Sequence, residues 1–246
     1  MLFRSEKGVR VVVTTRHPEK LASLGAEAIT TDDLDAHVRP GIRVLHSIPP
    51  DGPGNLLESL QGKAARVVYL SSTAVYGSET EVNERTPVDP SSDAARARIE
   101  AEREITEGPW SSLILRPAAI YGPGRGVQES IQRGEHSLSD RYVSRIHVDD
   151  LAAHAEAALL STVAGAFPVA DEEPCTSREI AEFCANLLHI PVTGPESNVR
   201  GQGYATRSPR FSNNRRVDGS AIRRALGIEL KYPSFRFGVP ASLTGI

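Results

Sequence analysis

The chain lacks the features that mark secreted, metal-binding or membrane proteins. Its 246 residues contain two cysteines, which is too few for a disulfide framework and, without further ligands, for a zinc site. No apolar run approaches the roughly 20 residues that span a bilayer, and the N-terminus lacks the apolar core of a secretory signal. We therefore expect a cytoplasmic protein with no metal site and no membrane association.

A strong excess of one charge is absent as well. The chain has 28 Lys and Arg against 31 Asp and Glu, a net charge of -3. A balance of this kind argues against general nucleic-acid binding and favours a small-molecule substrate. Arginines do gather near the C-terminus, and we interpret them as a solvated face or a site for a phosphate-bearing substrate. They are Arg207, Arg210, Arg215, Arg216, Arg223 and Arg224.

What is present is an alternation of short apolar runs and helical patterns. Runs of strand length occupy residues 9–15, 26–31, 43–48, 66–70 and 111–115, and helical patterns occupy 55–62 and 94–106. This alternation predicts an α/β fold with a parallel, doubly wound sheet. We expect irregular structure at 81–93 and in RPAAIYGPG at 116–124, because proline and glycine punctuate both segments.

The stretch RVVYLSSTAVYG, from Arg66 to Gly77, is the most informative one. Its apolar part has the length and β-branched content of a strand buried on both faces. The strand stops at three consecutive hydroxyls, those of Ser71, Ser72 and Thr73. Ligands of open α/β sheets bind at the carboxyl ends of the strands, so we expect an active site here.

Four motifs together resemble the extended short-chain dehydrogenase/reductase superfamily, in its NAD(P)-dependent epimerase/dehydratase family. They are YLSSTAVYG at 69–77, LRPAAIYGPG at 115–124, RIHVDDLA at 145–152 and LGIELKYPSFRFG at 226–238. The resemblance implies a Rossmann-like NAD(P)-binding domain at 1–122 and a smaller substrate-binding part at 123–246. Within the second part, residues 145–170 are expected to pack back on the nucleotide domain.

The resemblance also implies an activity. Members of the family move a hydride between the nicotinamide and a secondary alcohol or carbonyl, so we expect an oxidoreductase or isomerase, with a sugar-like substrate in view. The alternatives are a redox-silent NAD(P)-binding regulatory protein and an inactive, truncated member of the family. The cofactor is NADP or NAD, with NADP preferred.

Several site residues follow from the resemblance. Thr73 falls on the family's catalytic Ser/Thr, Ser71 is assigned to the cofactor site, and Pro117 falls in the loop that passes the nicotinamide. Arg16, after the second strand of the family's sheet, would favour the 2′-phosphate of NADP over the 2′-hydroxyl of NAD; a solvated surface arginine is the alternative. Asp33 is expected either to contact the adenine amino group or to be a simple turn residue.

The chain departs from the family at the catalytic pair. The family carries a Tyr, a Lys four residues later and a Glu four residues further on one helix, where the ammonium lowers the pKa of the phenol. With the Glu placed on Glu102, Arg98 takes the Lys position and Ala94 the Tyr position. Ala94 has no acid–base group. Arg98 keeps a positive charge for the cofactor ribose, although arginine does not replace lysine neutrally.

Two tyrosines are the nearest substitutes for the missing one. Tyr76 and Tyr121 each lie at a predicted strand end, as catalytic groups or as packing and substrate-contact residues. We assign Tyr76 to catalysis and Tyr121 to substrate binding. Arg145 is a candidate for an anionic substrate group, with a salt bridge to Asp149 or Asp150 as the alternative.

The helix at 94–106 and the N-terminus complete the expectations. The helix carries the ladder pairs Arg96/Glu100 and Arg98/Glu102, and many relatives pair as homodimers through it. No GxGxxG motif precedes Val9, and the family's first strand would lie between the strands at 9–15 and 43–48. Our preferred interpretation is a truncated chain; a domain that lacks the strand, or one that completes its sheet with another segment, is the alternative.

Overall fold

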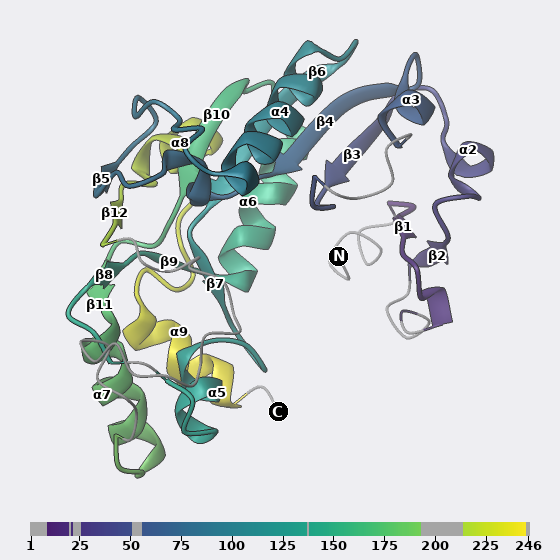
Figure 1. Cartoon of the computed structure of the whole chain (residues 1–246). Coiled ribbons are helices and arrows are strands. Elements are labelled where there is room, and N and C mark those ends of the chain that lie inside the picture. The colour runs from purple at the N-terminus through teal and green to yellow at the C-terminus, as the bar shows by residue number, and fades with distance from the viewer. Residues whose placement is uncertain are drawn as a thin grey trace.

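The computed structural model describes residues 9–19, 21, 26–50, 56–136, 138–192 and 214–244 (Figure 1). Its centre is a four-stranded parallel sheet in the order β10-β6-β4-β3. The strands are β3 (Ile42–His46), β4 (Ala64–Leu70), β6 (Ser111–Pro117) and β10 (Gly165–Val169). None of the described helices combines the length and apolarity needed to cross a bilayer.

Helices cover both faces of this sheet. Alternate side chains of each strand point to opposite faces, so the strands bury apolar side chains against helices on both sides. Val67 and Tyr69 of β4 pack in one apolar cluster with α3 (Leu56–Leu60) and α4 (Asp93–Glu107). Val68, between them, packs in another cluster with α6 (Val148–Leu160) and α8 (Ser220–Leu226). The chain therefore has the doubly wound α/β fold expected from its sequence.

A second parallel pair lies apart from the main sheet. It consists of β1 (Val12–Thr14) and β2 (Glu27–Ile29), followed by α2 (Leu34–His37). Within the described part of the chain, β1 pairs only with β2 and β3 only with β4. These two pairings leave the inner edges of β1 and β3 without a described partner strand, at the place where the family's first strand was expected.

The other elements form short pairs and a second helical group. The pairs are β5 (Glu81–Val82) with β12 (Arg216–Val217), β7 (Ala119–Tyr121) with β9 (Arg145–His147), and β8 (Tyr142–Val143) with β11 (Cys175–Thr176). The expectation of irregular structure at 81–93 and 116–124 was therefore wrong for β5 and β7, because pairing with distant segments makes them strands.

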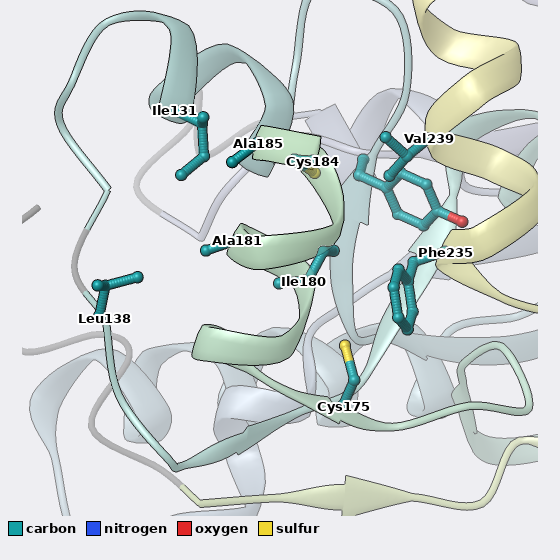
Figure 2. Close-up of a cluster of buried hydrophobic side chains, with 10 residues drawn as sticks. Ile131, Leu138, Cys175, Ile180, Ala181, Cys184, Ala185, Phe235 and Val239 are labelled. Atoms are coloured by element: carbon teal, nitrogen blue, oxygen red, sulfur yellow. The ribbon is translucent and has the colours of Figure 1, made fainter. Parts of the chain in front are cut away.

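The helices α5 (Val127–Gln132), α7 (Ser177–Leu188) and α9 (Phe235–Thr244) build a core of their own. Figure 2 shows Ile131, Ile180 and Phe235 pointing into this cluster, together with Cys184. A capping box of Thr176 and Glu179 begins α7. The expected division at residue 122 stays a prediction, although β10 joins the main sheet and α6 packs against it.

A buried arginine joins α6 to the main sheet. Arg66 of β4 is 3% exposed, and its guanidinium donates to the carbonyl oxygens of Ala158 at 2.7 Å and Val163 at 2.6 Å. The last carbonyls of a helix have no intrahelical donors, so Arg66 satisfies the end of α6 and fixes it beneath β4.

Candidate active site at the end of strand β4

The hydroxyls after β4 form a single 3-10 turn, Thr73–Tyr76. Ser72 caps this turn, since its side chain accepts a hydrogen bond from the Ala74 N–H at 3.1 Å. Gly77 ends it at φ 55°, where a Cβ would overlap the Asp89 carboxylate, so the position requires glycine. Thr73 is half-buried, and its hydroxyl has no hydrogen-bond partner within the described part of the chain. It is therefore free to bind a substrate oxygen.

A buried ionic network lies behind the turn. The Arg116 guanidinium donates to both oxygens of Glu102, at 3.1 and 2.6 Å, and to the Tyr76 hydroxyl at 3.0 Å. The Ser71 hydroxyl donates to the same Glu102 carboxylate. Ser71, Glu102 and Arg116 are 6, 6 and 8% exposed, and Tyr76 is 0% exposed. The network fixes the end of β4 to α4 and to β6.

The contacts of Arg116 and Glu102 bear on two expectations, the catalytic role of Tyr76 and the Arg98/Glu102 pair. The hydroxyl of Tyr76 accepts from Arg116, and burial raises its pKa while the Arg116 charge lowers it. Nothing in this geometry favours Tyr76 as a proton donor, and its catalytic role stays a prediction. The expected Arg98/Glu102 ladder pair was wrong, because Glu102 points inward to Arg116 and Ser71. The assignment of Ser71 to the cofactor likewise stays a prediction.

Arg215 holds the turn from the other side. It is 7% exposed, and its guanidinium donates to three carbonyl oxygens of the turn and its exit: those of Thr73, Gly77 and Glu79, the last at 2.9 Å. Burial lowers the pKa of Arg215. Its backbone N–H donates to the Tyr142 carbonyl at 2.9 Å. Arg215 thus links the segment before β12 to the turn that carries Thr73.

The two substituted positions of the family's catalytic pair lie on α4. Ala94 is exposed in its first turn, and Arg98 is half-buried one turn further on. The charge of Arg98 acts on Tyr69 of β4, whose pKa burial raises and Arg98 lowers. The Tyr69 hydroxyl is fully buried and has no hydrogen-bond partner among the described residues. The charge of Arg98 therefore reaches Tyr69 near the carboxyl end of β4, and α4 itself contacts the turn Thr73–Tyr76.

The residues assigned to the substrate are buried instead. Tyr121 is 2% exposed, packs its ring against Gly238, and donates from its hydroxyl to the Ser234 carbonyl at 3.4 Å. Arg145 is 6% exposed and donates to the Val143 carbonyl at 2.7 Å and the Cys175 thiol at 3.1 Å. Both roles stay predictions, in positions that pack the interior of the second helical group.

The alternative for Arg145, a salt bridge to Asp149 or Asp150, is not formed. Asp149 pairs with the ammonium of Lys231 at 3.2 Å. Asp150 is 1% exposed and accepts from the backbone N–H groups of Lys231 and Tyr232, at 2.7 and 3.0 Å. The two carboxylates at the start of α6 therefore bind the C-terminal segment.

The remaining assigned residues lie at other strand ends. Pro117 is buried as the last residue of β6. Arg16 is exposed two residues after β1, and Asp33 is exposed before α2, accepting from the Thr30 hydroxyl at 2.7 Å. That hydrogen bond is typical of a turn aspartate. Arg16 has no ion pair with any described residue, so its guanidinium is available to a ligand.

The C-terminal arginines do not form one face. Arg215 is the buried clamp, Arg216 pairs with Glu81 at 2.9 Å and lies over the Tyr142 ring, and Arg223 donates to Glu172 and to the Ala170 carbonyl. Arg207 and Arg210 lie outside the described residues.

Two features of the site were not predicted from the sequence: the contacts of Arg215 with the Thr73 turn, and the Glu102–Arg116 pair. The local signal for the pair was Arg116 itself, which follows the apolar run of β6. No three potential metal ligands come together among the residues that the structure describes.

The chain is similar to proteins of known and unknown function. The model of the NAD dependent epimerase/dehydratase family matches residues 51–153. A 3-diazoavenalumate denitrifying reductase from a Streptomyces species is 26% identical over 268 residues, which cover 96% of this chain and 88% of the reductase.

Two solved structures share the fold. A functionally unknown conserved protein from Silicibacter pomeroyi is 29% identical with a TM-score of 0.80, covering 99% of this chain and 93% of that one. The enzyme WbmG of Bordetella bronchiseptica, in complex with NAD and UDP, is 16% identical with a TM-score of 0.75, covering 98% and 87%.

Proposed function

Because this chain belongs to the NAD(P)-dependent epimerase/dehydratase family of the extended short-chain dehydrogenase/reductase superfamily, we propose that it moves a hydride between NADP and a secondary alcohol or carbonyl. The observation that carries the proposal is the free, half-buried hydroxyl of Thr73 on a turn held from both sides. The family supports an NAD(P)-dependent oxidoreductase or epimerase in general; the cofactor preference and the substrate class are our proposals.

The described residues offer partners for the two ends of the cofactor but not for the pyrophosphate between them. Around the end of β4, Thr73 and Arg98 offer a hydroxyl and a cation without described hydrogen-bond or ion-pair partners, which suit a substrate oxygen and the nicotinamide ribose. Arg16 is exposed beyond β1 and suits a 2′-phosphate. The described residues contain no glycine-rich turn for the pyrophosphate, so the structure offers no cradle for that part. When bound, the nicotinamide accepts or supplies the hydride.

The protein's own residues position and polarise the substrate. Thr73 donates a hydrogen bond to the oxygen at the reacting carbon, where such a preorganised donor stabilises developing negative charge. Arg215 and the Glu102–Arg116 network hold the turn, so the hydroxyl does not have to be ordered during the reaction. Neither Ala94 nor the Arg116-bound Tyr76 offers a ready proton donor. The proton is therefore exchanged with solvent or with the substrate itself.

For the substrate we propose a nucleoside diphosphate sugar. WbmG, which shares the fold, was solved with NAD and UDP. A sugar offers the secondary hydroxyl that hydride transfer requires.

Binding and turnover test the proposal separately. We expect NADPH to bind more tightly than NADH in a fluorescence titration, and we expect one nucleotide sugar in a panel to change the nicotinamide absorbance. Thr73→Val keeps the branched side chain and removes the hydroxyl, so turnover falls about 10²-fold or more, while Thr73→Ser retains most of it. Equal turnover in Thr73→Val and the wild-type protein would overturn the assignment of Thr73.

A redox-silent NAD(P)-binding protein is the second candidate, and Ala94 is the observation that favours it. The position where the family has its tyrosine carries a methyl group on an exposed helix turn. NADPH binding with no turnover on any substrate in the panel, and no gain on Ala94→Tyr, would support this alternative. No affinity for either nucleotide would contradict both candidates.

A further inference from the structure

A tight turn at residues 122–126, between β7 and α5, is held firmly although it lies at the surface. Gly122 and Arg125 exchange two backbone hydrogen bonds. The Gly122 N–H donates to the Arg125 carbonyl at 2.8 Å, and the Arg125 N–H donates to the Gly122 carbonyl at 3.0 Å. Between them, Gly124 adopts φ 68°, where a residue with a side chain would be strained. The backbone on both sides of the tip is therefore held in one arrangement.

A buried side chain holds the same turn from below. Gln128 of α5 is 0% exposed, and its amide nitrogen donates to the carbonyl oxygens of Gly122 at 2.8 Å and Arg125 at 3.1 Å. The amide oxygen of Gln128 has no hydrogen-bond partner among the described residues, and an acceptor left in that state costs free energy. The position thus carries an amide whose donors stabilise the turn at a cost to the interior.

Arg125 is the charged side chain that this turn presents. It is exposed, and its guanidinium has no ion pair or hydrogen bond with any residue that the structure describes. The acidic residues that follow it in the chain act on another arginine: Glu129 interacts with Arg133, which also pairs with Glu135 at 2.8 Å. A guanidinium on a fixed backbone, without a partner of its own, is preorganised for an anion.

The tip of the turn is open to a ligand. Gly124 is exposed, and a Cβ placed on it would meet no atom within 4 Å other than those of its chain neighbours. Its N–H has no hydrogen-bond partner within the described part of the chain. A bare glycine lets an oxygen anion approach the backbone closely, so the residue before Arg125 offers a second donor to the same anion.

The turn follows the edge of the sheet at which Thr73 lies. β4 and β6 are parallel, with Leu70 beside Leu115, so the two strands end at the same edge, where ligands of open α/β sheets bind. β7 begins directly beyond β6 and runs from the main sheet towards α5 (Figure 1). Its three residues span about 10 Å. Arg125 therefore lies beyond the reacting end of the site, towards the part of a long substrate that does not react.

We propose that Arg125 binds the diphosphate of the nucleotide-sugar substrate and selects for that group. The inference rests on the proposed function, since it takes the sugar to lie at Thr73. A guanidinium donates to two phosphate oxygens at once. Thr73 acts on the reacting oxygen, while Arg125 recognises a part of the substrate that stays unchanged and so positions the sugar. A free sugar has no such group and is discriminated against.

Calorimetric titration with UDP, GDP, CDP and dTDP tests the assignment, with excess NADPH present to fill the cofactor site. We expect at least one of these nucleotides to bind the wild-type protein saturably. For that nucleotide, Arg125→Ala weakens binding by at least about tenfold. Arg125→Lys keeps the charge but not the planar fork, so its affinity lies between the two. Arg224→Ala is the matched control, because Arg224 is exposed on α8 and has no ion pair with a described residue; it leaves the affinity unchanged.

The outcomes separate this inference from the proposed function. Equal affinity of Arg125→Ala and the wild-type protein would overturn the role of Arg125 and leave the substrate class standing. No saturable binding of any of the four nucleotides to the wild-type protein would overturn both. NADPH affinity, titrated separately, is expected to be the same in Arg125→Ala; a matching loss there would overturn the assignment, because Arg125 would then bind phosphates of the cofactor. Arg125-dependent nucleotide binding without any NADPH binding would contradict the redox function and support this site.

Discussion

Replacement of Asp171 by asparagine should change how the stability of the protein depends on pH. Burial raises the pKa of the Asp171 carboxyl from 3.8 to about 8, against the opposing effects of the Arg145 guanidinium and the Glu173 backbone N–H. Neither side-chain oxygen of Asp171 makes a full hydrogen bond with a described residue. In the unfolded chain the same carboxyl ionises at its ordinary pKa. Between these two values the folded protein therefore binds more protons at this site than the unfolded chain does.

The sign of the effect follows from this difference in bound protons. The contribution of Asp171 to the free energy of unfolding is greatest at acid pH and is lost as pH rises towards 8. Each pH unit inside the window changes it by about 1.4 kcal/mol, so the change between pH 5 and pH 7 is about 2–3 kcal/mol. For a chain of this size that corresponds to a shift of roughly 4–12 °C in Tm.

Four partly or fully buried histidines have the opposite effect on the free energy of unfolding, so the pH profile of the wild-type protein alone is not informative. Burial lowers the pKa of His46, His136, His147 and His154, which makes folding less favourable as pH falls below about 6.5. These contributions cancel when the variant is compared with the wild-type protein at each pH. The difference in free energy of unfolding, variant minus wild type, should rise by about 2–3 kcal/mol from pH 5 to pH 7.

Urea unfolding followed by circular dichroism at several pH values measures this difference. Asp32→Asn is the matched control, because Asp32 is exposed, and its profile should run parallel to that of the wild-type protein. Parallel profiles for Asp171→Asn as well would refute the reasoning, since they would mean that Asp171 is ionised in the folded protein or hydrated.

Three further outcomes are expected. Glu102→Gln leaves a buried guanidinium without its carboxylate and should lower the free energy of unfolding by about 3–5 kcal/mol, whereas the exposed Glu104→Gln should change it little; equal losses in a urea titration would contradict the buried network. Arg66→Met removes the donors at the end of α6 and should cost about 2–4 kcal/mol, with Arg43→Met on the exposed face of β3 as the control. Arg16→Ala should weaken NADPH binding by about tenfold and leave NADH binding unchanged; equal losses for both nucleotides would show that Arg16 does not read the 2′-phosphate.

The parallel sheet was predictable because its strands carry their own signal. The predicted runs at 66–70 and 111–115 fall inside β4 and β6, where Val67–Tyr69 and Leu113–Leu115 are consecutive, buried and apolar. The short strands carry no such signal. Val217 and Tyr121 are in strands only because they pair with Val82 and His147, which lie far away in the chain.

The candidate site, like the fold, could be predicted only where the signal is local in the sequence. Thr73 followed from an apolar run that ends in hydroxyls, which is a local pattern. Glu102 stands in a helix of alternating charges, where nothing in the sequence distinguishes the one carboxylate that points inward. Arg215 lay in an arginine cluster that suggested a surface, while its role depends on carbonyl groups of a distant turn. Such contacts exist only after tertiary folding.

The Arg215 clamp also sets when the site can form. Its three acceptors lie 136 to 142 residues earlier in the chain, so the contact is among the most non-local ones in the described part of the protein, and the entropy cost of closing so long a loop must be met before it forms. During synthesis the turn that carries Thr73 leaves the ribosome long before its clamp does. The nascent chain therefore carries the Thr73 turn before it carries the side chain that holds it, and termination before residue 215 removes all three of these hydrogen bonds to the turn and its exit.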